Sequence, residues 1–134
     1  MATLSEALAI AIQHHQAGRL QAAEQIYRKI LQVEPNQADA IHLPGVIAHQ
    51  LGKHEVAVEY IQRVIGLHGN VADFHIDLGE AYRALHRTPE TVACCRRALE
   101  LRPEYAEAQN NLGNVFWDQG KLDEAAACCR LALG

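Results

Sequence analysis

Aromatic residues are scarce in this chain. One Trp, two Phe and four Tyr make up 5% of its 134 residues, whereas apolar residues of all kinds make up 49%. Strands of β-sandwiches and barrels are enriched in aromatic and β-branched residues, while Ala and Leu are strong helix formers. Because Ala, Leu, Ile and Val supply most of the apolar share, the composition favours an all-α fold over a β-sandwich.

Basic clusters and long apolar runs are also missing. The formal net charge is -4 and the isoelectric point is near 6.0. Nonspecific nucleic-acid binding needs a clustered basic surface, so this charge argues against a nucleic-acid partner. No apolar run reaches the roughly 20 residues that span a bilayer, and no basic segment opens the chain. We therefore expect a soluble, cytoplasmic protein without a membrane partner.

Catalytic and zinc-binding motifs are absent as well. The sequence contains no GxSxG, no P-loop, no GxGxxG after a strand and no HExxH. Its four cysteines form two adjacent pairs, at 94–95 and 128–129, without the CxxC spacing of zinc sites. We expect these thiols to be reduced and packed as small apolar groups. The sequence predicts neither enzymatic activity nor a cofactor.

Histidine is frequent, with eight residues in the chain. His42 and His49 share a helix face but stand about 10.5 Å apart along it, too far to bind one metal ion together. A set drawn from two helices, such as His42, Asp73 and Asp77, is the metal-site alternative. Protonation of all eight histidines would change the formal charge from -4 to +4, so a pH-dependent switch is a second alternative.

A period of 34 residues runs through the chain. Shifting the sequence by 34 superposes VACCRRALEL, from Val92, on AACCRLALG, from Ala126, and FHIDLGEAY, from Phe74, on AQNNLGNVF, from Ala108. The same register predicts four repeats, at residues 4–37, 38–71, 72–105 and 106–134, the last one five residues short. Each repeat contains two amphipathic helices, so we predict eight helices within a single domain that spans residues 1–134.

Small and turn-forming residues recur at fixed places in these repeats. A small residue allows the two helices of each repeat to approach closely, and a residue suited to a positive φ stands between them, although His86 takes that place in the third repeat. The small residues are Ala11, Gly45, Gly79 and Gly113, and the turn residues are Gly18, Gly52, His86 and Gly120.

These repeats resemble the tetratricopeptide repeat family over nearly the whole chain. The residues that carry the resemblance are Leu112, Gly113, Phe116, Gly120, Ala125 and Ala132 in the fourth repeat, and Leu78, Gly79, Tyr82, Ala98 and Pro103 in the third. The resemblance implies a right-handed α-solenoid of stacked antiparallel helix pairs, whose first helices line a concave groove. It also implies that the groove binds an extended peptide or a partner protein.

Pro44 departs from the family pattern. It lies inside the predicted first helix of the second repeat, where the other repeats have Ile10, Leu78 and Leu112. Proline removes a helix hydrogen bond and clashes with the preceding turn, at a cost of about 3 kcal/mol. We expect the helix either to kink at Pro44 or to begin there.

The resemblance places a set of mostly polar side chains in the groove. Asn111 matches the asparagine ladder in the repeats of O-linked N-acetylglucosamine transferases, to which these repeats are similar, and amides of this kind pair both backbone groups of a peptide. The acidic members favour a basic peptide. The groove residues are Asp73, Asp77, Glu80, Arg83, Glu107, Asn110, Asn111, Asn114 and Trp117, with His42 and His49 in the more apolar N-terminal half.

Two alternatives to a peptide-binding scaffold remain open. The last helix is predicted to have no neighbour on one side, so its apolar residues Leu122, Ala125, Cys129 and Leu133 suit a homo-oligomer or a continuation of the repeats. The chain also suits the substrate-docking region of a larger glycosyltransferase-like enzyme.

Overall fold

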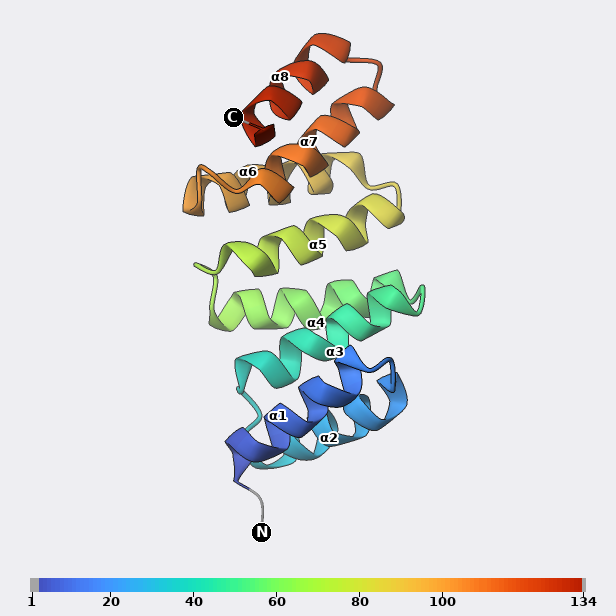
Figure 1. The fold of residues 1–134 in the computed structure, drawn as a ribbon, viewed down its shortest axis with the longest axis vertical. Coiled ribbons are helices and arrows are strands. Elements are labelled where there is room, and N and C mark those ends of the chain that lie inside the picture. Colours follow the sequence, from blue (N-terminus) through green and yellow to red (C-terminus); the bar gives the residue numbers. More distant parts are fainter. Residues whose placement is uncertain (1–2, 134) are drawn as a thin grey trace. The chain divides into compact units, whose positions relative to one another are not determined.

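The structure, a computed structural model, describes residues 3–133, and within this range it is all-α and contains no strand (Figure 1). Its helices pair into four hairpins whose first helices begin 34 residues apart, so the predicted repeats and the helical-repeat fold are confirmed. The helices are α1 (Leu4–Gln16), α2 (Leu20–Val33), α3 (Ala38–Gln50), α4 (His54–Leu67), α5 (Ala72–Ala84), α6 (Thr88–Leu101), α7 (Ala106–Asp118) and α8 (Leu122–Leu133).

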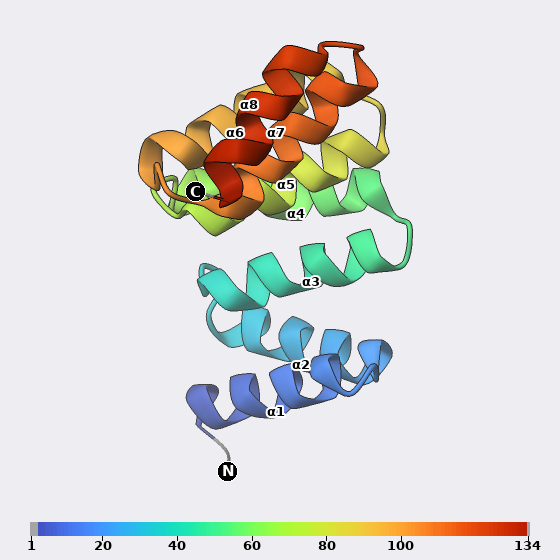
Figure 2. The ribbon, with the colours of Figure 1, turned by 45° about the horizontal axis from the view of Figure 1, so that its top comes forward.

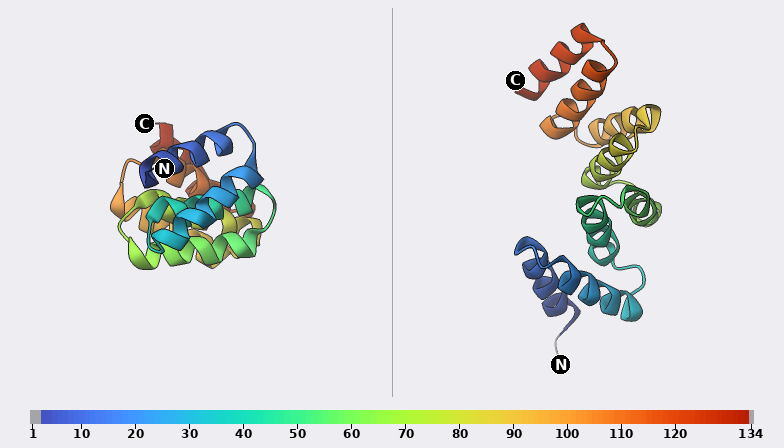
Figure 3. Two further views of the ribbon diagram at one scale, coloured as in Figure 1. Left: turned by 90° about the horizontal axis from the view of Figure 1, so that it is seen from below. Right: turned by 90° about the vertical axis from the view of Figure 1, so that its right-hand side faces the viewer.

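The chain divides into two compact units, residues 1–68 and 69–134, and each contains two hairpins. In the first unit, α2 packs against α1 and α3, and α4 packs against α3 (Figure 2). In the second unit, α6 packs in the same way against α5 and α7, and α8 packs against α7 (Figure 3). The organisation as a single domain stays a prediction.

Each unit has its own apolar core. The first core surrounds Tyr27 and Ile30 on α2, with Ala11 from α1 and Ile47 from α3. The second unit has a cluster around Ile76, Ala98 and Ala108 and another around Cys95, Leu112 and Cys128. Both cores are built mainly from small and aliphatic side chains, as the scarcity of aromatic residues indicates.

The turns between paired helices have the predicted left-handed residues. φ is +82° at Gly18, +79° at Gly52 and +77° at Gly120, and His86 adopts +59° in the third hairpin. His86 is the only residue other than glycine with a positive φ in residues 3–133. A positive φ is uncommon for a residue with a side chain, so the third turn has a less favourable backbone conformation than the three glycine turns.

Gly45 illustrates why the first helices need small residues. A Cβ atom at this position would lie 3.0 Å from Ile61 Cγ1 and 3.1 Å from Tyr60 Cβ, both on α4. Gly79 and Gly113 approach α6 and α8 in the same way. The predicted close contact within the hairpins is therefore confirmed in three of them.

Pro44 does not begin its helix. α3 starts six residues earlier, at Ala38, and continues through Pro44 to Gln50, so the expectation of a helix start at Pro44 is wrong. Two features stabilise the first turn: the Gln37 side chain accepts a hydrogen bond from the Ala40 amide at 2.6 Å, and the side chains of Ala40 and Ile41 are completely buried. Tertiary packing thus outweighs the missing hydrogen bond.

The cysteines pack as predicted in three of four positions. Cys94, Cys95 and Cys128 are buried, whereas Cys129 is exposed, and all four are free thiols. Burial is the largest cause that raises the pKa of Cys94 to about 12 and that of Cys95 to about 11. Because the thiolate is the reactive form, the buried thiols are poor nucleophiles.

Candidate functional site

Nine of the predicted groove residues belong to α5 and α7, the two first helices of the second unit, which contact each other directly. We call the surface that they share the α5–α7 face. Its members on α5 are Asp73, Asp77, Glu80 and Arg83, and its members on α7 are Glu107, Asn110, Asn111, Asn114 and Trp117.

Tyr105 joins the two helices at one end of the α5–α7 face. Its hydroxyl donates a hydrogen bond to Asp73 Oδ1 and lies 3.5 Å from Glu107 Oε2. Burial, followed by the hydrogen bond to Asp73, raises the pKa of Tyr105 well above its usual value. The Arg102 guanidinium lies 3.7 Å from Asp73 Oδ1 and 4.2 Å from the centroid of the Tyr105 ring. The positive charge of Arg102 therefore partly balances the negative charge of Asp73.

Neither Tyr105 nor Arg102 is among the residues predicted from the sequence. Both lie near or within the connection between α6 and α7, where the corresponding residues of the earlier repeats are of other types: Val71 and Gln37 occupy the place of Tyr105. No periodic signal marks such a position. Only the placement of α5 beside α7 shows that a side chain from the connection reaches Asp73.

Glu80 is the centre of the acidic part of the α5–α7 face. Its half-buried carboxyl makes side-chain hydrogen bonds with Glu107 and Asn111, and Asp77 lies close enough to act on it electrostatically. Burial contributes most to raising the pKa of Glu80 to about 7, followed by the hydrogen bond to Glu107 and the negative charges of Asp77 and Glu107, whereas the Asn111 bond lowers it. The structure thus brings three of the predicted residues, Asp77, Glu107 and Asn111, around the carboxyl of a fourth, Glu80.

The remaining predicted residues of this face are more exposed. Arg83 forms an ion pair with Asp118, at 3.4 Å between Nη2 and Oδ2. Asn110 and Asn114 are exposed on α7, and the Trp117 side chain is 65% exposed. The exposed indole is a large apolar surface in a part of the chain that is otherwise polar.

The two histidines predicted for the N-terminal half of the groove lie on α3, in the first unit. Both side chains are half-buried. His49 Nδ1 lies 2.9 Å from Nδ1 of His54, the first residue of α4, so its ring packs against the second helix of its own hairpin. The assignment of His42 and His49 to a groove stays a prediction.

No group of three or more His, Cys, Asp or Glu side chains in residues 3–133 is arranged to hold a metal ion. In the same range, none of the helices is both long and apolar enough to cross a membrane.

Hairpins that repeat every 34 residues, with small residues at their crossings and left-handed turns between their helices, define a helical repeat protein of the solenoid class. A family model of the tetratricopeptide repeat matches residues 45–104 and 76–134, so the chain belongs to the tetratricopeptide repeat family. This membership supports a role in protein interaction. No curated protein matches the chain in sequence.

Solved structures of MamA have the same fold. One crystal structure of MamA superposes with a TM-score of 0.89 at 20% identity and covers 98% of this chain and 77% of its own. A structure of residues 41 to the end of MamA from Desulfovibrio magneticus RS-1 gives a TM-score of 0.88 at 19% identity, with 98% and 74% coverage. At this level of identity, the likeness extends to the fold alone.

Proposed function

We propose that the chain is a protein-binding module without catalytic activity, and that the α5–α7 face binds a partner segment that carries a basic side chain. The observation that carries this proposal is the arrangement around Glu80. Three carboxyl groups, those of Asp77, Glu80 and Glu107, lie close together on a partly desolvated surface. Burial and the neighbouring carboxyl groups raise the pKa of Glu80 to about 7, so Glu80 holds a proton near neutral pH.

A Lys or Arg side chain of a partner would relieve the repulsion among these carboxylates. The neighbouring cations of the chain are less suited to do so, because Arg83 pairs with Asp118 and Arg102 pairs with Asp73. Charge complementarity of this kind increases the rate of encounter and disfavours acidic competitors.

The asparagines of α7 supply a second kind of contact. An extended peptide has unpaired backbone N–H and C=O groups, and an asparagine amide can donate to one and accept from the other. Asn110 and Asn114 are exposed, and Asn111 lies beside Glu80. The α5–α7 face therefore combines a site for a basic side chain with partners for the adjoining backbone.

Capture of partners from a cell lysate tests this proposal. The immobilised chain is compared with a variant carrying Asp77→Ala, Asn111→Ala and Asn114→Ala, and mass spectrometry identifies the proteins that the variant loses. Glu59→Ala, which removes an exposed acid on α4, is the control for a general loss of negative charge. We expect a set of proteins to be lost with the triple variant and retained with the control. Identical sets from all three proteins would exclude the α5–α7 face as the binding surface.

Self-association through α8 is a second candidate function, supported by the exposure of its apolar residues. Leu131 is 66% exposed and Leu133 is 91% exposed. In the preceding repeat, the counterpart of Leu133 is Leu99, which packs against both apolar clusters of the second unit. Likewise Cys129 is exposed, whereas its counterpart Cys95 is buried against Leu112 of α7. The outer face of α8 thus has the composition of a surface that another first helix covers.

Sedimentation equilibrium separates the two candidates. If α8 mediates self-association, the average mass rises with concentration, and the double variant Leu131→Glu and Leu133→Glu stays monomeric. A constant monomer mass for the unaltered chain would eliminate this candidate and leave the α5–α7 face unaffected.

We also propose that the chain acts in the cytoplasm. Four free thiols, one of them exposed, are compatible with a reducing compartment and would be at risk of oxidation outside it.

A further inference from the structure

Three of the four hairpins have a ring and a basic residue at corresponding positions. The ring lies near the end of the first helix, and the basic residue lies five positions later, directly before the second helix. In the first hairpin, Arg19 Nε donates a hydrogen bond to His14 Nδ1 at 2.8 Å. In the fourth, Lys121 Nζ lies 5.8 Å from the centroid of the Phe116 ring. The third hairpin has Tyr82 and Arg87 at these positions.

The second hairpin keeps the cation but lacks the ring. Lys53 occupies the basic position, at the N-cap of α4, while Ala48 stands where the other hairpins have His14, Tyr82 and Phe116. Pro44, one turn earlier on α3, also replaces the leucine of the third and fourth repeats. Two adjacent positions therefore have less side-chain volume here than in either hairpin of the second unit.

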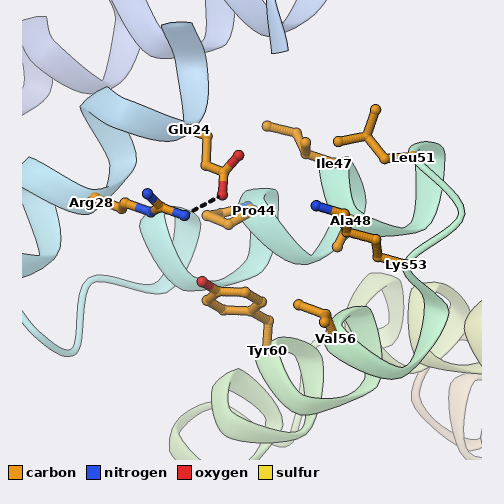
Figure 4. Close-up of a pocket in the computed structure, with 9 residues that line it drawn as sticks. All are labelled: Glu24, Arg28, Pro44, Ile47, Ala48, Leu51, Lys53, Val56 and Tyr60. Atoms are coloured by element: carbon orange, nitrogen blue, oxygen red, sulfur yellow. Dashed lines mark hydrogen bonds and ion pairs between the residues drawn. The ribbon is translucent and has the colours of Figure 1, made fainter. Parts of the chain in front are cut away.

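A pocket of about 160 Å³ lies where the ring is missing, between α2, α3 and α4 of the first unit (Figure 4). A cavity of roughly 150 Å³ is large enough to bind benzene, so this volume suits one phenyl ring and is too small for a long alkyl chain. The pocket is lined by Glu24, Arg28, Pro44, Ile47, Ala48, Leu51, Lys53, Val56 and Tyr60.

The chemistry of the lining matches an aromatic occupant. Pro44, Ile47 and Ala48 are buried and form an apolar surface, and Tyr60 presents its ring from α4. Glu24 is engaged with Arg28 at 2.8 Å, so the rim carries a neutral ion pair and the additional positive charge of Lys53. The ammonium group of Lys53 would attract the face of a bound aromatic ring. The ring of Tyr60 would stabilise the same bound ring further by an aromatic–aromatic contact.

We propose that this pocket binds the side chain of a phenylalanine or tyrosine from a partner polypeptide, which takes the place of the ring that Ala48 does not supply. The contact between Lys121 and Phe116 within the fourth hairpin is the internal precedent for the contact between Lys53 and the ring of the partner. A basic side chain is disfavoured by the positive charge of Lys53. The site is independent of the α5–α7 face, since all of its residues lie in the first unit.

Nuclear magnetic resonance titration of the ¹⁵N-labelled chain with N-acetyl-phenylalanine amide tests the proposal. We expect saturable shifts of amides around the pocket in the first unit. The cyclohexylalanine analogue has a similar size but no π system, so it should bind about two- to five-fold more weakly, a ratio that follows from a solvent-exposed cation–π contact.

Substitutions at two positions, Ala48 and Lys53, separate the effect of the pocket's volume from that of its charge. Ala48→Phe restores the ring, so it should raise the melting temperature and abolish the shifts, and Ala48→Leu serves as a smaller filling if phenylalanine lowers the melting temperature. Lys53→Gln should remove the preference for phenylalanine over cyclohexylalanine, whereas Lys29→Gln, on the exposed part of α2, should preserve it.

Three results would overturn the proposal. One is the absence of shifts around the pocket, and another is undiminished binding of the probe to both Ala48 variants. The third is a concentration-dependent mass of the unaltered chain that Ala48→Phe abolishes, because the occupant would then be a second copy of this chain and not a separate partner.

Discussion

Tyr27 carries the one buried side-chain hydroxyl in residues 3–133 that has no hydrogen-bond partner. Its ring lies in the centre of the first core and is completely buried. Burial, followed by the negative charge of Asp39, raises the pKa of Tyr27 to about 12. An unsatisfied buried hydroxyl costs free energy, while the ring contributes to packing, so the two parts of this residue have opposite effects on stability.

We predict that Tyr27→Phe raises the free energy of unfolding by about 1 kcal/mol, because it removes the unsatisfied hydroxyl and keeps the ring. Tyr27→Ala removes both and should lower the free energy of unfolding by about 3–5 kcal/mol. Urea denaturation followed by circular dichroism measures both values. A loss of stability in Tyr27→Phe would mean that the hydroxyl has a partner in solution.

Glu80 links the stability of the chain to pH. Its pKa is about 7 in the folded state and 4.5 in the absence of the fold. The folded state therefore binds more protons at this residue between these two values, so the contribution of Glu80 to stability is greatest below the lower value and is lost as the pH rises through the folded-state value. This direction is opposite to that of a carboxylate stabilised by a salt bridge.

We predict that Glu80→Gln raises the free energy of unfolding near pH 8 by roughly 1 kcal/mol, after allowance for the solvent that screens a half-exposed carboxyl. Near pH 5 the glutamine should have little effect, because Glu80 is then protonated and already neutral. Thermal denaturation at both pH values measures the difference. Glu104→Gln, an exposed acid of the same unit, should show no such pH dependence.

At the scale of the helices, glycine has two different roles. Gly45 lies at the crossing of α3 and α4, where a Cβ atom would meet two fixed atoms at 3.0 and 3.1 Å. Gly66 lies within α4, and a Cβ atom there would meet nothing within 4 Å. The first glycine is required for packing, while the second only reduces helix propensity.

We predict that Gly45→Ala lowers the free energy of unfolding by about 1–3 kcal/mol through overpacking. Gly66→Ala should raise it by about 0.5–1 kcal/mol through helix propensity. The pair forms an internally controlled experiment, since the two chemical changes are identical and both helices belong to one hairpin. An equal increase in the free energy of unfolding for both variants would show that the crossing of α3 and α4 can widen without cost.

The helices were predictable from sequence because their signals are local and periodic. The 34-residue period locates every hairpin, and Gly18, Gly52, Gly120 and His86 mark the turns by their backbone requirements. The predicted helix start at Pro44 was wrong because helix propensity is a local property, whereas α3 is stabilised by buried contacts in its first turn.

The chemistry of the candidate site was predictable only in part. The period identifies Asp77, Glu80, Glu107 and Asn111 as residues of first helices, but their mutual contacts depend on how α5 lies beside α7. The same holds for Tyr105, which reaches Asp73 across 32 residues of sequence. The empty ring position at Ala48 was readable in principle, since the repeats can be aligned, but its significance depends on the pocket that it leaves.

For the whole molecule, the ionisation of Glu80 has opposite effects on folding and on binding. The ionised form destabilises the fold, and the same form attracts a basic partner. Asp77 on α5, Glu107 and Asn111 on α7, and Cys95 on α6 face this carboxyl, and the negative charges among them favour a bound cation further. The free chain should therefore lose stability over the pH range in which it gains affinity for a basic segment.

We predict that a short peptide containing lysine binds several-fold more tightly near pH 8 than near pH 6, because Glu80 ionises between them. The chain also has eight histidines, a residue type that in general titrates near neutral pH. Glu80→Gln isolates the carboxyl, since it keeps the histidines and should reduce the pH dependence of the affinity. Isothermal titration calorimetry at both pH values measures this reduction, and an unchanged pH dependence in the variant would assign the effect to the histidines instead.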